Sequence, residues 1–145
     1  MLSRLALELK EADEGLAAGM AEARRNGWEV TIAVVDAGGH LILLARLDNA
    51  SPSSVDTAVG KARTAALTGV PSKLVENMIS DRPALLSLDR VAVEGGVPIL
   101  FKGQKLGGVG VSGVQSAQDA QAQVAEAAAA AISAVLAVQV DAPTG

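Results

Sequence analysis

The chain has 145 residues, the length of one ordinary domain, so we predict a single domain over residues 1–145. The net charge is −4, and there is no cluster of Lys or Arg and almost no aromatic residue for base stacking, which argues against nucleic acid as a partner. Half of the residues are apolar, and the mean hydropathy of +0.34 is high for a small soluble monomer. We therefore expect apolar surface to be buried between subunits of a homo-oligomer.

The first segment of the chain mixes charged and apolar side chains. This mixture interrupts the apolar run that a signal peptide or a membrane span needs, so we expect a cytoplasmic protein without a membrane partner. Leucines recur at near-helical spacing from Leu2, and we predict an amphipathic helix that runs to about Arg25. Asn26 and Gly27 then end it.

Two β-rich apolar runs follow, over 28–35 and 41–47. The residues between them, 36–39, include two glycines and favour a tight turn, so we predict a hairpin. Both runs are apolar on both faces, which predicts central strands that are covered on each side.

The rest of the chain is divided by proline and glycine. Ser51 is the expected N-cap of a helix with Pro52 at its first position, and this helix extends to Gly69. The further predicted elements are a helix that opens at Pro71, a short helix and a strand edge over 84–93, strands over 97–101 and 105–113, a helix from Ser116–Asp119 to about Val138, and a frayed tail over 139–145.

The order of these elements is helix, hairpin, helices, hairpin, helix. A parallel α/β fold would alternate strands and helices one by one, and this chain does not. The sequence therefore predicts an α+β layer architecture, with an antiparallel sheet and helices packed on it.

A polar stripe marks the predicted helix after Ser51. Its members are three or four residues apart and so lie on one face: Ser54, Thr57, Lys61, Thr64 and Thr68. They are short hydroxyls around a single cation, whereas a solvated face usually carries Glu, Lys and Gln. We weigh a ligand-facing stripe, in which Lys61 contacts an anion, equally with a solvated face.

A glycine-rich strand lies near the end of the domain. Alternation places Gly108, Gly110 and Ser112 on one face, which lets something approach the backbone closely. We favour a helix, through the alanines at 125, 128 and 129, over a flat ligand as the partner. A dinucleotide fingerprint is rejected, because these glycines fall inside the strand and not between a strand and a helix.

Four polar residues in and after the first hairpin are further candidates. Asp36 at the turn is a turn-capping residue or a catalyst, and His40 is an exposed side chain, a general base or a metal ligand. Arg46 and Asp48 form a surface ion pair or flank the mouth of a cleft. Nothing in the sequence has the spacing of a metal site, and we predict none.

Four parts of the sequence taken together resemble one known family: VTIAVVDAGGHLILLARLDNA (30–50), KARTAALTGVPS (61–72), GGVPILFKGQKLGGVGVSG (95–113) and Asp119. They are similar to the GlcG/HbpS-like domain, which also forms the C-terminal part of PduO-type proteins. The resemblance implies a profilin-like fold, homo-oligomers up to octamers, and binding or degradation of haem or related compounds. Haem as a cofactor is implied by this resemblance alone.

These observations lead to a hypothesis and two alternatives. We expect an oligomeric protein that binds a small planar or anionic ligand, which Ser54, Lys61, Thr64 and Arg46 contact above the glycine strand. The first alternative is a cofactor-free isomerase, lyase or hydrolase of a small organic acid, with Lys61 and Arg46 on the carboxylate and Asp36, Asp48 or His40 moving protons. The second is a structural or signalling partner protein.

Overall fold

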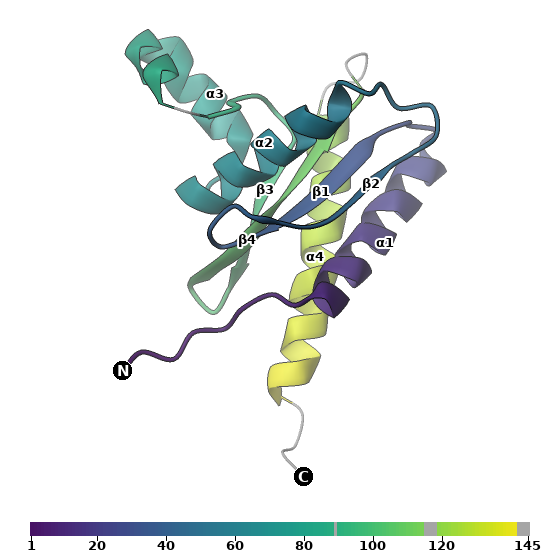
Figure 1. Ribbon diagram of the computed structural model, residues 1–145, viewed down its shortest axis with the longest axis vertical. Helices are drawn as coiled ribbons and strands as arrows, with labels where there is room; N and C mark the ends of the chain where they lie inside the picture. Colours follow the sequence, from purple (N-terminus) through teal and green to yellow (C-terminus); the bar gives the residue numbers. More distant parts are fainter. Residues whose placement is uncertain (89, 115–118, 142–145) are drawn as a thin grey trace.

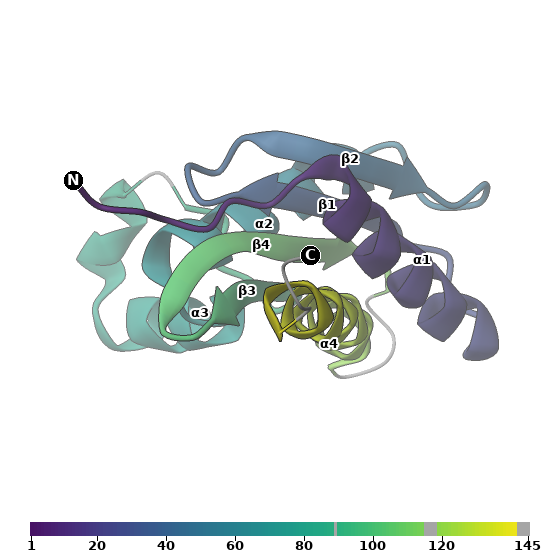
Figure 2. The same ribbon diagram turned by 90° about the horizontal axis from the view of Figure 1, so that it is seen from below.

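The computed structural model describes residues 1–88, 90–114 and 119–141. Its elements are, in chain order, α1 (Leu9–Arg25), β1 (Thr31–Asp36), β2 (Leu41–Arg46), α2 (Ser54–Thr68), α3 (Ser72–Asp81), the 3-10 helix η1 (Pro83–Ser87), β3 (Gly96–Phe101), β4 (Gln104–Ser112) and α4 (Ala120–Asp141). The four strands form one antiparallel sheet in the order β2-β1-β4-β3. Helix α2 covers one face of this sheet, and α1 and α4 lie side by side on the other (Figures 1 and 2). The α+β single domain predicted from the sequence is thus the fold of the described chain.

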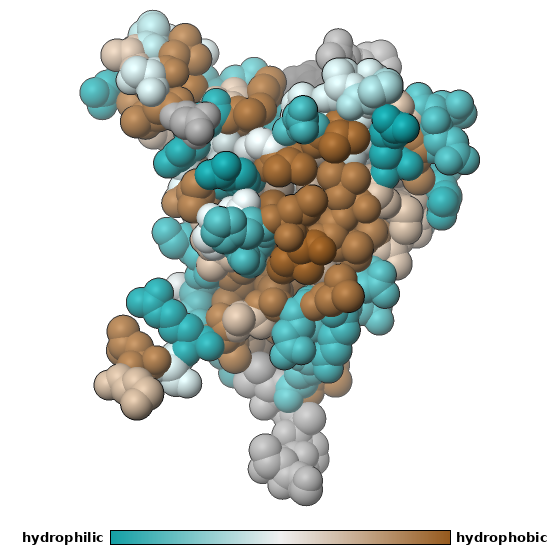
Figure 3. All heavy atoms as spheres, in the orientation of Figure 1, coloured by the Kyte–Doolittle hydropathy of each residue, from teal (hydrophilic) through white to brown (hydrophobic). Residues whose placement is uncertain are grey.

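Both predicted hairpins are present, but their strands differ in position. β1 pairs with β2 on one side and with β4 on the other, so it is a central strand as predicted. β2 is an edge strand, and the prediction that it is central was wrong. Its apolar composition leaves Leu41 half exposed, and apolar side chains gather over β2 between α1 and α2 (Figure 3).

The two faces of the sheet pack in different ways. The face toward α1 and α4 carries most of the large aliphatic core, including Ile32, Val109 and Ile132. The face toward α2 holds a thin alanine and valine layer, because α2 lies almost directly on the backbone of β4. A Cβ atom added at Gly110 would be 1.9 Å from the carbonyl oxygen of Ala58. Helix α2 can therefore approach only a strand that has no side chain at this position.

The helix that meets the glycine face is α2 and not the C-terminal helix. Gly108 faces the Ala62 carbonyl of α2, 2.3 Å from an added Cβ. Ala125 and Ala128 of α4 belong to the core on the opposite side of the sheet. The prediction that a helix packs closely on these glycines is confirmed, but the predicted helix, α4, was wrong. The glycines and the valines of β4 alternate between two covered faces, and α4 lies on the valine face.

The N-terminal ends of two helices differ from their predictions. α1 begins at Leu9, and the residues before it are extended along the β3–β4 hairpin, where the Leu5 N–H donates to Gln104 Oε1 at 3.2 Å. α2 begins at Ser54, three residues after the expected N-cap. Ser51 instead accepts from the N–H of Ser53 at 3.3 Å, in a turn that precedes the helix.

The predictions for the second half of the chain hold in part. α2 ends as expected, with Gly69 in the left-handed conformation (φ 75°). The short helix predicted within 84–93 is present as η1, but the described residues of this region hold no strand. α4 extends to Asp141, so 139–141 are helical and not part of a frayed tail, and the rest of that tail, like the predicted helix start at 116–118, lies outside the described residues. By length and composition α4 could cross a membrane, but it packs here against α1 and the sheet.

Candidate functional site: a cavity at one end of the sheet

A cavity of about 1040 Å³ opens where β1 begins and β4 ends. Helices α2 and α3 and the start of α4 form its walls. Its apolar lining comes from Trp28, Val93 and Val114, and its polar lining includes Ser54, Thr57, Lys61, Lys73, Glu76, Glu94, Ser112 and Gln121. The cavity therefore offers both cations and carboxylates to a ligand, beside a small apolar patch.

Lys61 is the buried cation of this site. Only 3% of the residue is exposed, and its Nζ donates to the carbonyl oxygen of Val111 at 3.1 Å. Burial lowers the pKa of this amine, while the charges of Glu94 and Glu76 oppose the shift. Within the described part of the chain, neither carboxylate forms an ion pair with Nζ, so its single neutral acceptor leaves the ammonium poorly compensated.

Glu94 is fixed at the start of α4. Its Oε1 accepts from the N–H of Ala122 at 2.6 Å, and its Oε2 accepts from Gln121 Nε2 at 2.7 Å. Gln121 Oε1 in turn accepts from the N–H of Gly113 at 3.0 Å. A carboxylate from the loop before β3 thus occupies the positive end of the α4 dipole and ties this helix to the end of β4.

Glu76 connects α3 to the same loop. One of its oxygens, Oε2, accepts from the N–H of Glu94 at 3.2 Å. Ser72, also on α3, donates to the Val93 carbonyl and accepts from the N–H of Gly96 at 2.7 Å. The outer wall of the cavity is held to the sheet by these contacts.

Part of the predicted polar stripe lines the cavity, and the rest forms hydrogen bonds within the fold. Ser54, Thr57 and Lys61 line the cavity, whereas Thr64 and Thr68 do not. Thr64 Oγ1 is buried and accepts from the N–H of Val91 at 3.0 Å, and Thr68 Oγ1 donates to the Thr64 carbonyl at 2.6 Å. Three of the five residues of the stripe, Ser54, Lys61 and Thr64, are buried, whereas Thr68 is exposed. The stripe is therefore not solvated along its whole length, and two of its hydroxyls form hydrogen bonds within the fold.

Ser54 has a double role. Its Oγ lies 2.6 Å from Thr31 Oγ1 on β1 and donates to the Ser51 carbonyl at 2.5 Å. This buried bridge places the first turn of α2 over the start of β1. Ser112, the partner of Thr31 across the sheet, also lines the cavity, whereas Gly108 and Gly110 lie beneath α2 and outside the lining.

The residues of the first hairpin turn are remote from Lys61. Asp36 Oδ1 accepts from the N–H groups of Gly38 and His40 at 2.9 and 3.0 Å, the arrangement of a turn-capping aspartate. Asp36 lies four positions along β1 from Ile32, the residue opposite Val111, which amounts to about 13 Å at the rise of a strand. The structure therefore does not bring Asp36 or the exposed His40 together with Lys61.

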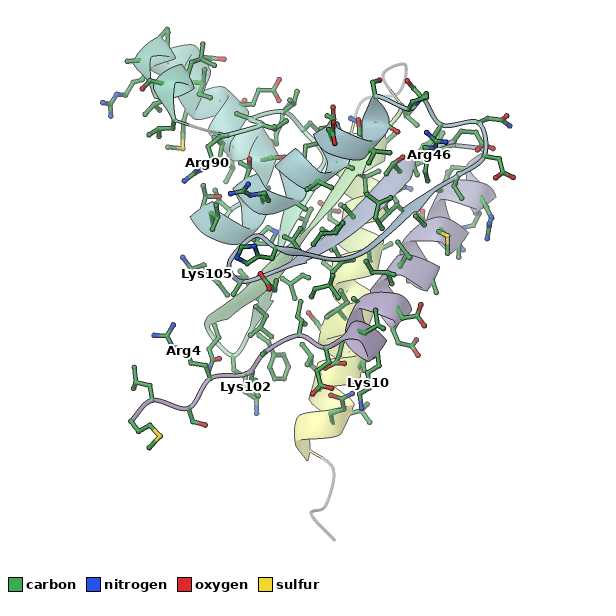
Figure 4. The ribbon with its side chains drawn as sticks, in the orientation of Figure 1. Arg4, Lys10, Arg46, Arg90, Lys102 and Lys105 are labelled. Carbon is green, nitrogen blue, oxygen red and sulfur yellow. The ribbon has the colours of Figure 1, made fainter. Side chains whose placement is uncertain are left out.

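Arg46 and Asp48 are exposed and lie outside the cavity lining. Arg46 is opposite Thr31, at the same end of the sheet as the cavity but on the edge strand, while Lys105 lies toward the other end (Figure 4). Among the described residues, Arg46 and Asp48 form no ion pair with each other.

Several polar residues of the site were absent from the sequence interpretation, among them Lys73, Glu76, Glu94 and Gln121. They come from α3, from the loop before β3 and from the first turn of α4, and no periodic pattern connects them. The sequence feature that came nearest to revealing these residues was the pair of glycines Gly95 and Gly96. An added Cβ at Gly95 would lie 3.1 Å from Lys61 Nζ, so this glycine leaves room for the lysine.

The fold and the cavity define a single-domain α+β protein with a polar ligand-sized site at the end of its sheet. Comparison with known proteins identifies the family. The model of the family described as "Haem degrading protein HbpS-like" matches residues 7–130, and the chain belongs to this family. Protein GlcG of Escherichia coli strain K12 is 44% identical over 114 residues, which cover 77% of this chain and 85% of that protein.

Solved structures agree with this assignment. A double mutant of HbpS from Streptomyces reticuli has a TM-score of 0.83 and 31% identity, and the match covers 90% of this chain and 89% of that one. A structure described as the PduOC:Heme Complex has a TM-score of 0.77 at 24% identity, covering 88% and 95% of the two chains, and shows the shared fold. The GlcG/HbpS-like resemblance and the fold predicted from the sequence are confirmed.

Proposed function

We propose that this protein binds a small anionic molecule in the cavity at the end of the sheet, with Lys61 as the central anion contact. The observation that carries the proposal is the burial of Lys61 beside a cavity with one neutral hydrogen-bond acceptor and no ion-pair partner among the described residues. An anionic group of a ligand would supply the missing countercharge. Lys73 on the facing wall offers a second cation to the same ligand.

Haem is the cofactor that the family implies, and the donor set of the cavity tests it. Protein ligands to haem iron are usually His, Cys, Met or Tyr, and no residue of these types lines the cavity in the described part of the chain. His40 is exposed at the other end of β1, Met78 is half exposed on α3, and Met20 packs against the core beneath the sheet. The lysines suit the carboxylates of a porphyrin, but the site does not fit haem iron.

A ligand titration separates the contribution of the porphyrin carboxylates from that of the haem iron. We expect haem and metal-free protoporphyrin IX, which carry the same two carboxylates, to bind with similar affinity. Quenching of the Trp28 fluorescence measures the binding of each compound. Lys61→Met should weaken both by about tenfold or more, because a charge-assisted hydrogen bond is lost. The exposed Lys102→Met is the matched control. Much tighter binding of haem than of protoporphyrin, abolished by His40→Ala, would contradict the proposal.

A second candidate function is a cofactor-free enzyme that acts on a small organic acid, as an isomerase, lyase or hydrolase. It is favoured by the lowered pKa of Lys61 and by the carboxylates of Glu76 and Glu94 around it. Proton transfer would then fall to these carboxylates, because the turn that contains Asp36 and His40 lies far from Lys61. Turnover of a small organic acid that survives Lys61→Ala would remove Lys61 from its assigned role in this function.

We further propose that the chain self-associates in the cytoplasm through β2. Among the described residues this edge strand pairs only with β1, and Leu41 at its start is 52% exposed. Apolar side chains gather on the surface over this strand (Figure 3). A second copy related by a twofold axis would pair β2 with its own equivalent and cover that surface. Light scattering should report an oligomer for the natural chain and a smaller species for Leu41→Lys, whereas Leu86→Lys on η1 should leave the mass unchanged.

A further inference from the structure

We propose that Lys61 is a carbonyl-reactive amine, which forms a Schiff base with a short 2-oxo acid that enters the cavity. The inference rests on the proposed function, since the cavity must first admit a small anion. It adds a covalent step to that function and assigns a chemical class to the ligand.

The position of Lys61 favours a nucleophilic amine. A buried ammonium with one neutral acceptor is poorly stabilised, and its uncharged form, which carries the lone pair, is correspondingly favoured. The hydrogen bond to Val111 holds Nζ at the end of β4, just past the last β3–β4 pair, Gly96 and Gly110. Nζ is therefore fixed at the cavity wall, where a carbonyl carbon can be presented to it.

The surrounding carboxylates can move the protons that the reaction needs. Both oxygens of Glu94 already accept hydrogen bonds from α4. Glu76 has only Oε2 engaged within the described residues, by the N–H of Glu94, and its Oε1 remains available. Glu76 is thus the better proton donor and acceptor beside Lys61.

The step balances without an oxidant or a metal. The Lys61 ammonium first gives a proton to the Glu76 carboxylate. The freed Nζ lone pair then attacks the carbonyl carbon, a C–N bond forms while the C=O π bond breaks, and the oxygen takes that proton from Glu76. Nitrogen loses a second proton to Glu76, the hydroxyl takes this proton from Glu76 and leaves as water, and the nitrogen lone pair closes the C=N bond of a protonated imine. The net change is the loss of one water molecule for each imine formed.

Lys73 selects the class of carbonyl compound. It lines the same cavity from α3 and gives a cation to which a carboxylate can bind while Lys61 holds the carbonyl. A 2-oxo acid carries these two groups on adjacent carbons. A simple aldehyde has only the first group and should react less readily.

The test traps the imine in the unsubstituted chain of 145 residues. The protein is incubated with pyruvate and sodium cyanoborohydride near neutral pH, digested, and mapped by mass spectrometry. We expect a single reduced adduct on Lys61, less adduct when propionaldehyde replaces pyruvate, and loss of the adduct in Lys61→Arg, which keeps the charge but cannot form the imine. Lys105→Arg, in an exposed position, is the matched control and should leave the Lys61 adduct unchanged.

Other results would overturn the inference. Adducts spread over the exposed lysines at 10, 102 and 105 without preference for Lys61 would show ordinary surface chemistry. Saturable quenching of Trp28 by pyruvate with no reducible adduct would leave the proposed binding function intact and remove the covalent step. Absence of both quenching and adduct would remove the 2-oxo acid as a ligand, while binding of porphyrin carboxylates would still test the proposed function separately.

Discussion

The carboxylate of Glu94 accepts a hydrogen bond from the backbone N–H of Ala122, 2.6 Å away, and so caps a helix that begins more than twenty residues later in the chain. The cap usually comes from a side chain next to the helix. Here a loop of the cavity supplies it, so the stability of α4 and the shape of the cavity depend on the same residue.

Glu94→Ala is expected to lower the free energy of unfolding by about 1–2 kcal/mol, the range measured for loss of a helix cap. Glu94→Gln keeps an oxygen that can accept from Ala122 and should cost less. Urea unfolding followed by circular dichroism measures both. Glu126→Ala, on the exposed face of α4, is the control, and a loss as large as that of Glu94→Ala would show that the cap is not responsible.

Gly110→Ala is expected to destabilise the fold by at least about 3 kcal/mol, because overpacking against backbone atoms cannot be relieved by a rotamer change. The new Cβ would meet the Ala58 carbonyl at 1.9 Å and the Ala62 nitrogen at 2.5 Å. Thermal unfolding should show a large fall in Tm or no folded protein. Gly38→Ala, where the nearest atoms belong to the exposed His40 side chain, should change Tm little. Equal effects of the two substitutions would contradict backbone-to-backbone packing of α2 on β4.

Glu11→Met is expected to stabilise the protein by about 1–3 kcal/mol, the cost of a buried polar group without a partner. Glu11 is 3% exposed, and its Oε2 has no hydrogen-bond partner among the described residues. Methionine has a similar shape and removes the unpaired oxygen. Glu14→Met, an exposed position on the same helix, should be close to neutral in the same unfolding assay. A loss of stability in Glu11→Met would show that the carboxylate has a partner in the assembled protein.

Lys61→Met should change how stability depends on pH. The pKa of Lys61 is lowered by burial from its ordinary 10.5, with Glu94 and Glu76 opposing, so the unfolded chain holds this proton to a higher pH than the folded protein does. The natural protein therefore carries the full cost of the buried charge below the lowered pKa and regains stability as pH rises toward 10.5.

The stability of Lys61→Met relative to the natural protein should thus decline between pH 7 and pH 10. Urea titrations of both proteins across this range, with Lys102→Met as the exposed control, measure the difference. A constant offset at every pH would mean that the Lys61 amine binds its proton equally in the folded and unfolded chain.

Much of the fold could be predicted from the sequence, because its elements leave local signals. The glycines of the first turn and Gly69 at the end of α2 mark boundaries through the backbone conformations they permit, and both are found where expected. The position of β2 at the sheet edge left no such signal. Its apolar residues have the pattern of a covered strand, and the surface that would cover Leu41 lies outside a single chain.

The candidate site could be predicted only where its residues share one element. Ser54, Thr57 and Lys61 follow the helical period and point to one face of α2. Glu76 and Glu94 reach the same cavity through tertiary packing between separate segments, which periodicity does not report. Asp36 and His40 have suitable chemistry for catalysis, but the register of the sheet places their turn away from Lys61.

The contact of α2 with a bare β4 also bears on how new binding specificities could be built on this domain. Lys61 lies on a helix whose backbone packs directly on the backbone of β4. Few substitutions at this contact would therefore preserve the fold. Lys73 and Glu76 stand on α3, where only Ser72 and Val75 are buried. Substitutions on α3 can therefore change what the cavity accepts while the amine stays in place, which makes this helix the natural target for redesign of the ligand.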